Sequence, residues 1–162
     1  MSERWVINAS PVILLAKAGV IEFLPRLCAE LVVPVGVVSE VASGQHSDAG
    51  RAWLAGPGSA FLRDSFLSHP SLAGAGLGLG ESQVLSWALH HPGFKTVLDD
   101  RQGRLWAKRL GLPLVGSLGV VVLLKRHGWL KQVAPALEKI RTAGAYVSDA
   151  AIRAALIEAG EL

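Results

Sequence analysis

Cysteine is nearly absent from this chain, since Cys28 is the only one among 162 residues. A single cysteine cannot form an internal disulfide, and it has no neighbouring thiols with which to build a zinc cluster. Disulfide-stabilised scaffolds and cysteine-based zinc modules are therefore excluded. The scarcity of cysteine predicts a reducing setting, the cytoplasm, with Cys28 as an ordinary core residue.

Long hydrophobic runs are also missing. The longest apolar run, residues 118–124, is far shorter than the roughly 20 residues that span a bilayer, and Lys125 and Arg126 end it. Near the amino terminus, Asn8 and Pro11 interrupt the apolar residues, which differs from the clean apolar segment of an export signal. The sequence therefore predicts a soluble protein that does not enter a membrane.

Charged residues are scarce at 18%, and the formal net charge is only +3. This mild positive charge permits a polyanionic partner without requiring one. The glycine-rich tract of residues 65–80 matches neither G-x-G-x-x-G nor the G-x-x-x-x-G-K-[ST] phosphate loop. It indicates a flexible approach to the next helix, and the missing fingerprints count against a small-molecule nucleotide binder of the doubly wound type.

What the chain does contain is 51% hydrophobic residues, arranged as short apolar runs that alternate with helical patterns. The runs at residues 5–7, 31–33, 60–62, 96–98 and 112–115 predict strands, and the patterns at 10–19, 20–28 and 81–90 are among the predicted helices. Ser10 and Pro11 are the expected cap and first-turn proline of the first helix. Strands that alternate with helices form parallel sheets covered on both faces.

We therefore expect a three-layer α/β/α sandwich whose central parallel sheet has about four to five strands. A length of 162 residues suits a single domain, 1–162. The C-terminal helices, from about residue 130, are expected to pack on it.

Two adjacent carboxylates, Asp99 and Asp100, come directly after the apolar run 96–98 and before a basic helix that ends at Gly111. In open parallel sheets, ligands bind beyond the carboxyl ends of the strands, so these acids stand where chemistry occurs. Asp is also a preferred N-cap, and either residue taken singly is explained equally well as a cap alone.

Three further oxygen donors are expected near the same edge of the sheet. Asn8 follows the first strand, Glu40 lies on the helix after the second, and Glu81 opens a later helix. Glu40 is also explained as a solvated surface acid, and Glu81 as a carboxylate that compensates the helix dipole. Hard oxygen donors without a cysteine cluster select Mg²⁺ or Mn²⁺ rather than zinc, and a shared cation would relieve the repulsion between the carboxylates.

Basic side chains lie beside the acids. Arg101, Arg104 and Lys108 recur at the spacing i, i+3, i+7 and would hold phosphate oxygens without reading a base sequence. A solvated helix face explains them equally well. Ser117, at the end of the last predicted strand, is another candidate for the crevice, although capping of the next helix is its more ordinary role.

Four segments follow, in order and over nearly the whole chain, the pattern of PIN-domain proteins: VINASPVILLAKAG, VVPVGVVSEV, LGLGESQVLSWAL and VLDDRQGRLWAKRLGLPLVGSLGVVVLLKRHG. No single segment is specific, but the four in order are. The chain most resembles an uncharacterised PIN-like branch related to toxins of VapC-type toxin–antitoxin pairs. The resemblance implies an Mg²⁺- or Mn²⁺-dependent ribonuclease that leaves 5′-phosphates on RNA, frequent homodimers, and inhibition by an antitoxin protein.

The resemblance also implies the roles of the site residues. Asp100 and Glu40 match main metal-ligand positions, Glu81 a second ligand or the base, and Asn8 the group that orients a water molecule. Asp99 lies at the variable place before Asp100, as a reserve metal ligand and the expected cap of the following helix.

Two departures from the family pattern bear on activity. Asn8 is neutral where the family commonly has Asp, and Glu81 is one methylene longer than the usual Asp. The loss of one negative charge weakens cation binding. A second interpretation therefore stays open, a degenerate PIN-like domain that binds RNA or a partner protein without cleaving.

Overall fold

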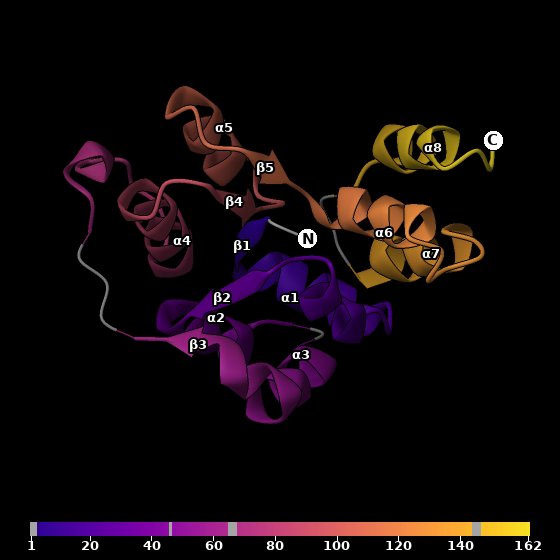
Figure 1. Ribbon diagram of the computed structural model, residues 1–162, viewed down its shortest axis with the longest axis horizontal. Coiled ribbons are helices and arrows are strands. Elements are labelled where there is room, and N and C mark those ends of the chain that lie inside the picture. Colours follow the sequence, from indigo (N-terminus) through magenta and orange to yellow (C-terminus); the bar gives the residue numbers. More distant parts are fainter. Residues whose placement is uncertain (1–2, 46, 65–67, 144–146) are drawn as a thin grey trace.

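The computed structural model describes residues 3–45, 47–64, 68–143 and 147–162. Its centre is a sheet of five parallel strands: β1 (Arg4–Ile7), β2 (Glu30–Pro34), β3 (Leu62–Arg63), β4 (Phe94–Val97) and β5 (Leu114–Val115). Helices cover both faces of the sheet (Figure 1). The expected three-layer α/β/α sandwich with a parallel central sheet is therefore confirmed.

Helices connect the strands and form the outer layers. In Figure 1, α4 (Leu79–His90) lies to the left of the strands, and α6 (Ser117–Arg126), α7 (Ala134–Ala143) and α8 (Asp149–Glu158) lie to the right. The other α-helices are α1 (Ala9–Lys17), α2 (Val35–Ser43), α3 (Asp48–Ala55) and α5 (Arg101–Arg109). Three short 3-10 helices span Ile21–Arg26, Pro57–Phe61 and Pro70–Leu72.

The strand order is β3-β2-β1-β4-β5, so the chain moves outward from β1 and then returns to its other side. β1 pairs with β2 and with β4, placing Trp5 opposite both Leu31 and Lys95. The connections that leave β1 and β4 therefore run toward opposite outer strands of the sheet, so the strand order reverses between these two strands. Such a switch point is where parallel α/β sheets bind ligands.

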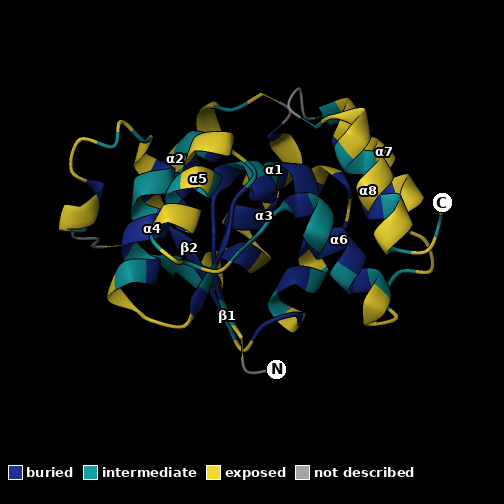
Figure 2. Ribbon diagram, turned by 90° about the horizontal axis from the view of Figure 1, so that it is seen from above, coloured by how far each residue is buried: buried dark blue, intermediate teal, exposed yellow. Residues whose placement is uncertain are grey.

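The interior is continuous and apolar. Val6, Ile7, Val32 and Val33 are fully buried because helices cover both sides of their strands, as Figure 2 shows by the dark blue centre of the molecule. Cys28 is buried as predicted, and burial raises the pKa of its thiol to about 12. Within the described ranges, no helix is long and apolar enough to cross a membrane.

The structure corrects several element predictions. Residues 20–28 form the short 3-10 helix Ile21–Arg26 rather than an α-helix, because Pro25 lies inside it and has no N–H to continue an α-helical ladder. Of the strand expected at 60–62, only Leu62 is in a strand, because residues 60–61 end the 3-10 helix Pro57–Phe61; β3 is Leu62–Arg63, which pairs with Val33 and Pro34.

The glycine-rich tract is also more ordered than a flexible loop. Pro70–Leu72 forms a 3-10 helix, and α4 begins at Leu79 rather than at Glu81. Residues 65–67 of this tract lie outside the described residues.

Candidate functional site

Asn8 stands at the junction of β1 and α1. It occupies the N-cap position of α1, yet its side chain makes no capping hydrogen bond and is only 2% exposed. In the part of the chain that the structure describes, its Oδ1 has no hydrogen-bond partner. Because a buried acceptor without a donor costs about 1–3 kcal/mol of folding free energy, we expect a ligand or an ordered water to bind this oxygen.

Glu40 reaches from the middle of α2 to the first turn of α4. Its Oε1 accepts a hydrogen bond of 2.7 Å from the backbone N–H of Gly80, one of the free amides at the start of α4. A Cβ added at Gly80 would stand 2.8 Å from Glu40 Oε2 and 3.0 Å from Asn8 Oδ1. Gly80 therefore lets two oxygens, from β1 and α2, approach the same backbone position.

Glu81 is half-buried next to Gly80 and has a perturbed pKa. Burial, then the charges of Asp100 and Glu40, and then a hydrogen bond with Asp100 raise the pKa of Glu81 to about 7. A Cβ at Gly103, in the first turn of α5, would stand 3.6 Å from Glu81 Oε2. The three acids therefore act on one another across α2, α4 and the start of α5.

Asp100 is the N-cap of α5, and the prediction that Asp99 caps this helix is wrong. The Oδ2 of Asp100 accepts a hydrogen bond of 3.1 Å from the backbone N–H of Gly103. The backbone of Asp100 is still extended while Arg101 is already helical, which is the conformation from which a side chain can cap. Capping places the Asp100 carboxylate over the first turn of α5, beside Glu81.

Asp99 points to a different place, the start of α6. Its Oδ1 accepts from the backbone N–H of Ser117 at 2.7 Å, and its Oδ2 accepts from the hydroxyls of Ser117 at 2.6 Å and Ser10 at 3.3 Å. Neither serine is an N-cap, contrary to expectation, because Asn8 and Gly116 hold those positions. Asp99 thus joins the β4–α5 turn to the first turns of α1 and α6.

The basic residues of α5 divide into two kinds. Arg104 is half-buried, and its Nη1 donates to the carbonyl of Leu98 at 2.8 Å, which fixes one end of its guanidinium beside the strand end. Arg101 and Lys108 are exposed. Like Arg109 at the end of the helix, this second pair presents its charge to solvent in the way that a phosphate contact on the surface requires.

The chemical type of the oxygen donors indicates whether the site suits a divalent cation. The orphaned Asn8 Oδ1, the Glu40 carboxylate and the acid pair Glu81–Asp100 are hard donors of the kind that Mg²⁺ and Mn²⁺ take. As they stand, however, no three His, Cys, Asp or Glu side chains among the described residues are placed to hold a metal by themselves. The donor chemistry fits a cation whose shell combines one or two carboxylates, the Asn8 amide and water.

The structure therefore brings Asn8, Glu40, Glu81 and Asp100 to the switch point and turns Asp99 and Ser117 toward each other. The contributions of Ser10 and of the backbone of Gly80 were missed. The glycine directly before Glu81 was the available signal, because a close approach of side chains to backbone needs a residue without a Cβ.

Comparison with known proteins gives one positive finding. The model of the family described as PIN domain matches residues 4–161. No curated protein and no solved structure matches the chain.

Proposed function

The chain belongs to the PIN-domain family, whose fold is a nuclease fold that commonly works with divalent metals on nucleic acid, and on this premise we propose that it is an Mg²⁺- or Mn²⁺-dependent endoribonuclease. One observation carries the proposal: the buried Asn8 Oδ1, which receives no hydrogen bond from the described residues, faces Glu40 across Gly80, next to an acid whose pKa is about 7. Buried acceptors and coupled acids of this kind are explained by a cation and by proton transfer.

Each residue has a distinct role in hydrolysis of the RNA backbone. A bound divalent cation would supply an activated water and neutralise charge that develops at the phosphate. Glu40 and Asp100 would hold it, directly or through water, and Asn8 Oδ1 would orient a water molecule. Glu81 exchanges its proton near neutral pH, which suits a base that accepts the proton of the attacking water.

Substrate binding is assigned to α5 and its surroundings. Arg101 is exposed directly after Asp100, so a phosphate that contacts it lies close to the acids, and Lys108 is exposed in the last turn of the same helix, where it would contact a more distant phosphate. Arg104 contributes through the part of its guanidinium that Leu98 does not engage. We assign Ser117 to positioning rather than to substrate, because its hydroxyl and amide are directed at Asp99.

We further propose that the protein is the toxin of a toxin–antitoxin pair and acts as a homodimer, which rests on the resemblance to the VapC-related branch. Exposed apolar side chains at the starts of α2 and α4, Val35 at 43% and Leu79 at 58% exposure, lie near the acids and offer contact area for a protein partner. The alternative is a PIN-like domain that binds RNA without cleaving it. The neutral Asn8, in the place of an acid, favours that alternative.

The test is RNA cleavage by the purified chain with Mn²⁺, compared with Asp100→Asn and Glu40→Gln. Both substitutions keep the local hydrogen bonds, because Asn also caps helices and a Gln carbonyl can accept from Gly80 N–H. We expect loss of cleavage by roughly 100-fold or more in each variant, with thermal stability retained.

The matched control is Glu138→Gln, which removes an exposed carboxylate that pairs with Arg141 far from the site. Cleavage that persists unchanged in Asp100→Asn and Glu40→Gln would refute the proposal. RNA binding without any cleavage by the unmodified chain would establish the alternative.

A further inference from the structure

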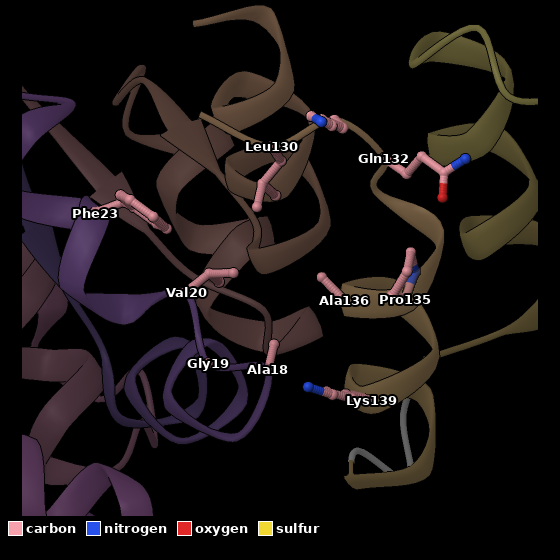
Figure 3. Close-up of a pocket in the computed structure, with 10 residues that line it drawn as sticks. Ala18, Gly19, Val20, Phe23, Leu130, Gln132, Pro135, Ala136 and Lys139 are labelled. Atoms are coloured by element: carbon pink, nitrogen blue, oxygen red, sulfur yellow. The ribbon is translucent and has the colours of Figure 1, made fainter. Parts of the chain in front are cut away.

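A cavity of about 400 Å³ lies away from the acids, between the end of α1 and the start of α7. Asn8 and Gly19 flank opposite ends of α1, a nine-residue helix roughly 13 Å long, so the cavity and the acids are separated by the length of that helix. Figure 3 shows Val20 and Phe23 on one side of the cavity and Leu130, Ala136 and Lys139 on the other. Its size falls in the range of small-ligand sites.

The walls of the cavity are apolar. Ala18, Val20 and Ala136 are buried, and Phe23 and Leu130 are partly exposed and pack against the core. The ring of Phe23 also stacks on Trp129, with 6.1 Å between centroids. A flat, rigid aromatic surface therefore continues from the cavity wall.

The polar residues at the rim are cationic or neutral. Lys131, Gln132 and Lys139 line the cavity, and no Asp or Glu is among its lining residues. Both lysines are exposed, and within the described ranges neither has an ion-pair partner. The neighbouring Glu138 pairs with Arg141 instead. Two ammonium groups that form no ion pair with the described residues thus flank an apolar cavity.

A further cation extends the same surface. The guanidinium of Arg26 lies 4.3 Å from the ring centroid of Trp129 and 5.9 Å from that of Phe23. The ring of His127 also stacks on Trp129, with 5.1 Å between the ring centroids. Aromatic faces combined with Arg and Lys are the elements by which proteins hold a base and its phosphate without reading sequence.

We propose that this cavity is a second nucleotide site, which takes a nucleoside phosphate with its base against Phe23 and Val20 and its phosphate between Lys131 and Lys139. The ligand is a free nucleotide or one unit of an RNA strand, since the two share this chemistry. The site does not depend on hydrolysis at the acids.

The test is calorimetric titration with AMP, with UMP and with hexauridylate in the presence of EDTA, which removes divalent cations from the acids. We expect binding by the unmodified chain. Lys131→Ala combined with Lys139→Ala is expected to weaken it by about fivefold or more, from the loss of two exposed charge contacts. Phe23→Leu, which keeps the charge and most of the apolar volume, is expected to weaken it through lost stacking.

Arg153→Ala is the matched control, because it removes one exposed positive charge on α8 and should leave the affinity unchanged. Thermal unfolding of each variant checks that it folds. AMP binding that exceeds hexauridylate binding identifies a free nucleotide as the ligand, and the reverse identifies an RNA strand.

Three results would overturn the proposal: no binding of any of the three probes, binding unaffected by the lysine and phenylalanine substitutions, or stronger binding of hexaglutamate, which would indicate an acidic peptide. Asp100→Asn separates this site from the acids, because it is expected to abolish cleavage and to leave AMP affinity unchanged. A loss of RNA cleavage and a loss of nucleotide binding at this cavity are therefore measured independently.

Discussion

At the scale of single residues, the site is defined by side-chain oxygens in unfavourable surroundings. Among the residues that the structure describes, none donates a hydrogen bond to the buried Asn8 Oδ1, and Glu81 is an acid whose pKa is raised to about 7 by burial and by its neighbours Asp100 and Glu40. Both features cost stability in the metal-free protein. A cation offsets both costs, so stability and ligand binding are coupled at these residues.

The neutral Asn8 is expected to limit cation affinity. Asn8→Asp adds a carboxylate beside Glu40, so Mn²⁺ should bind about tenfold more tightly, while the metal-free variant loses roughly 1–3 kcal/mol through like-charge repulsion. Calorimetry with Mn²⁺ and urea unfolding in EDTA measure the two effects. Gln132→Glu, an amide-to-acid change at an exposed position, is the control. Unchanged Mn²⁺ affinity in Asn8→Asp would place the cation elsewhere.

Glu81 predicts a pH-dependent stability. Because the folded-state pKa, about 7, lies above the ordinary 4.5, the proton on Glu81 stabilises the folded state fully below pH 4.5, and this contribution is lost as pH rises through 7. Glu81→Gln replaces the titrating carboxyl by a neutral amide, so the variant does not lose this stability as pH rises. It should therefore be more stable than the unmodified chain at pH 8 and not at pH 4.5.

Urea unfolding in EDTA at the two pH values measures this difference, with Glu22→Gln on the exposed side of Ile21–Arg26 as the control for removal of a carboxylate. An equal effect of Glu81→Gln at both pH values would contradict the raised pKa.

At the scale of elements, the two aspartates after β4 organise different helices. Asp100 caps α5 and brings its carboxylate to α4, whereas Asp99 joins the first turns of α1 and α6. Glu40 makes the third connection, from α2 to the first turn of α4. The starts of these helices are therefore connected by carboxylates, which accept hydrogen bonds from free N–H groups and from hydroxyls in the first turns.

Asp99 is expected to act as a positioning residue rather than as a metal ligand. Asp99→Ala removes three hydrogen bonds to a carboxylate and should cost roughly 2–4 kcal/mol of stability, and Ser117→Ala about 1 kcal/mol, while the Mn²⁺ affinity of both variants stays within about threefold of the unmodified chain. Urea unfolding and calorimetry measure both quantities. Loss of Mn²⁺ binding in Asp99→Ala with full stability would make Asp99 a ligand after all.

At the scale of the whole molecule, the two proposed sites lie at opposite ends of α1. The order β3-β2-β1-β4-β5 puts the switch point between β1 and β4, so the residues after these strands meet at one edge. The helix that follows β1 ends at the opposite edge, where the basic, aromatic cavity lies.

The sequence by itself determined the layer architecture, because burial on both faces leaves short apolar strands between helices, a pattern that is local. It also located Asn8, Glu81 and Asp100 at or next to element boundaries, and Glu40 on the helix after the second strand. The tertiary structure decided which aspartate caps α5, that Ser10 meets Asp99 across 89 residues, and that Glu40 reaches Gly80 across 40. These contacts depend on how helices far apart in the chain are oriented against one another, and neither propensity nor spacing contains that information.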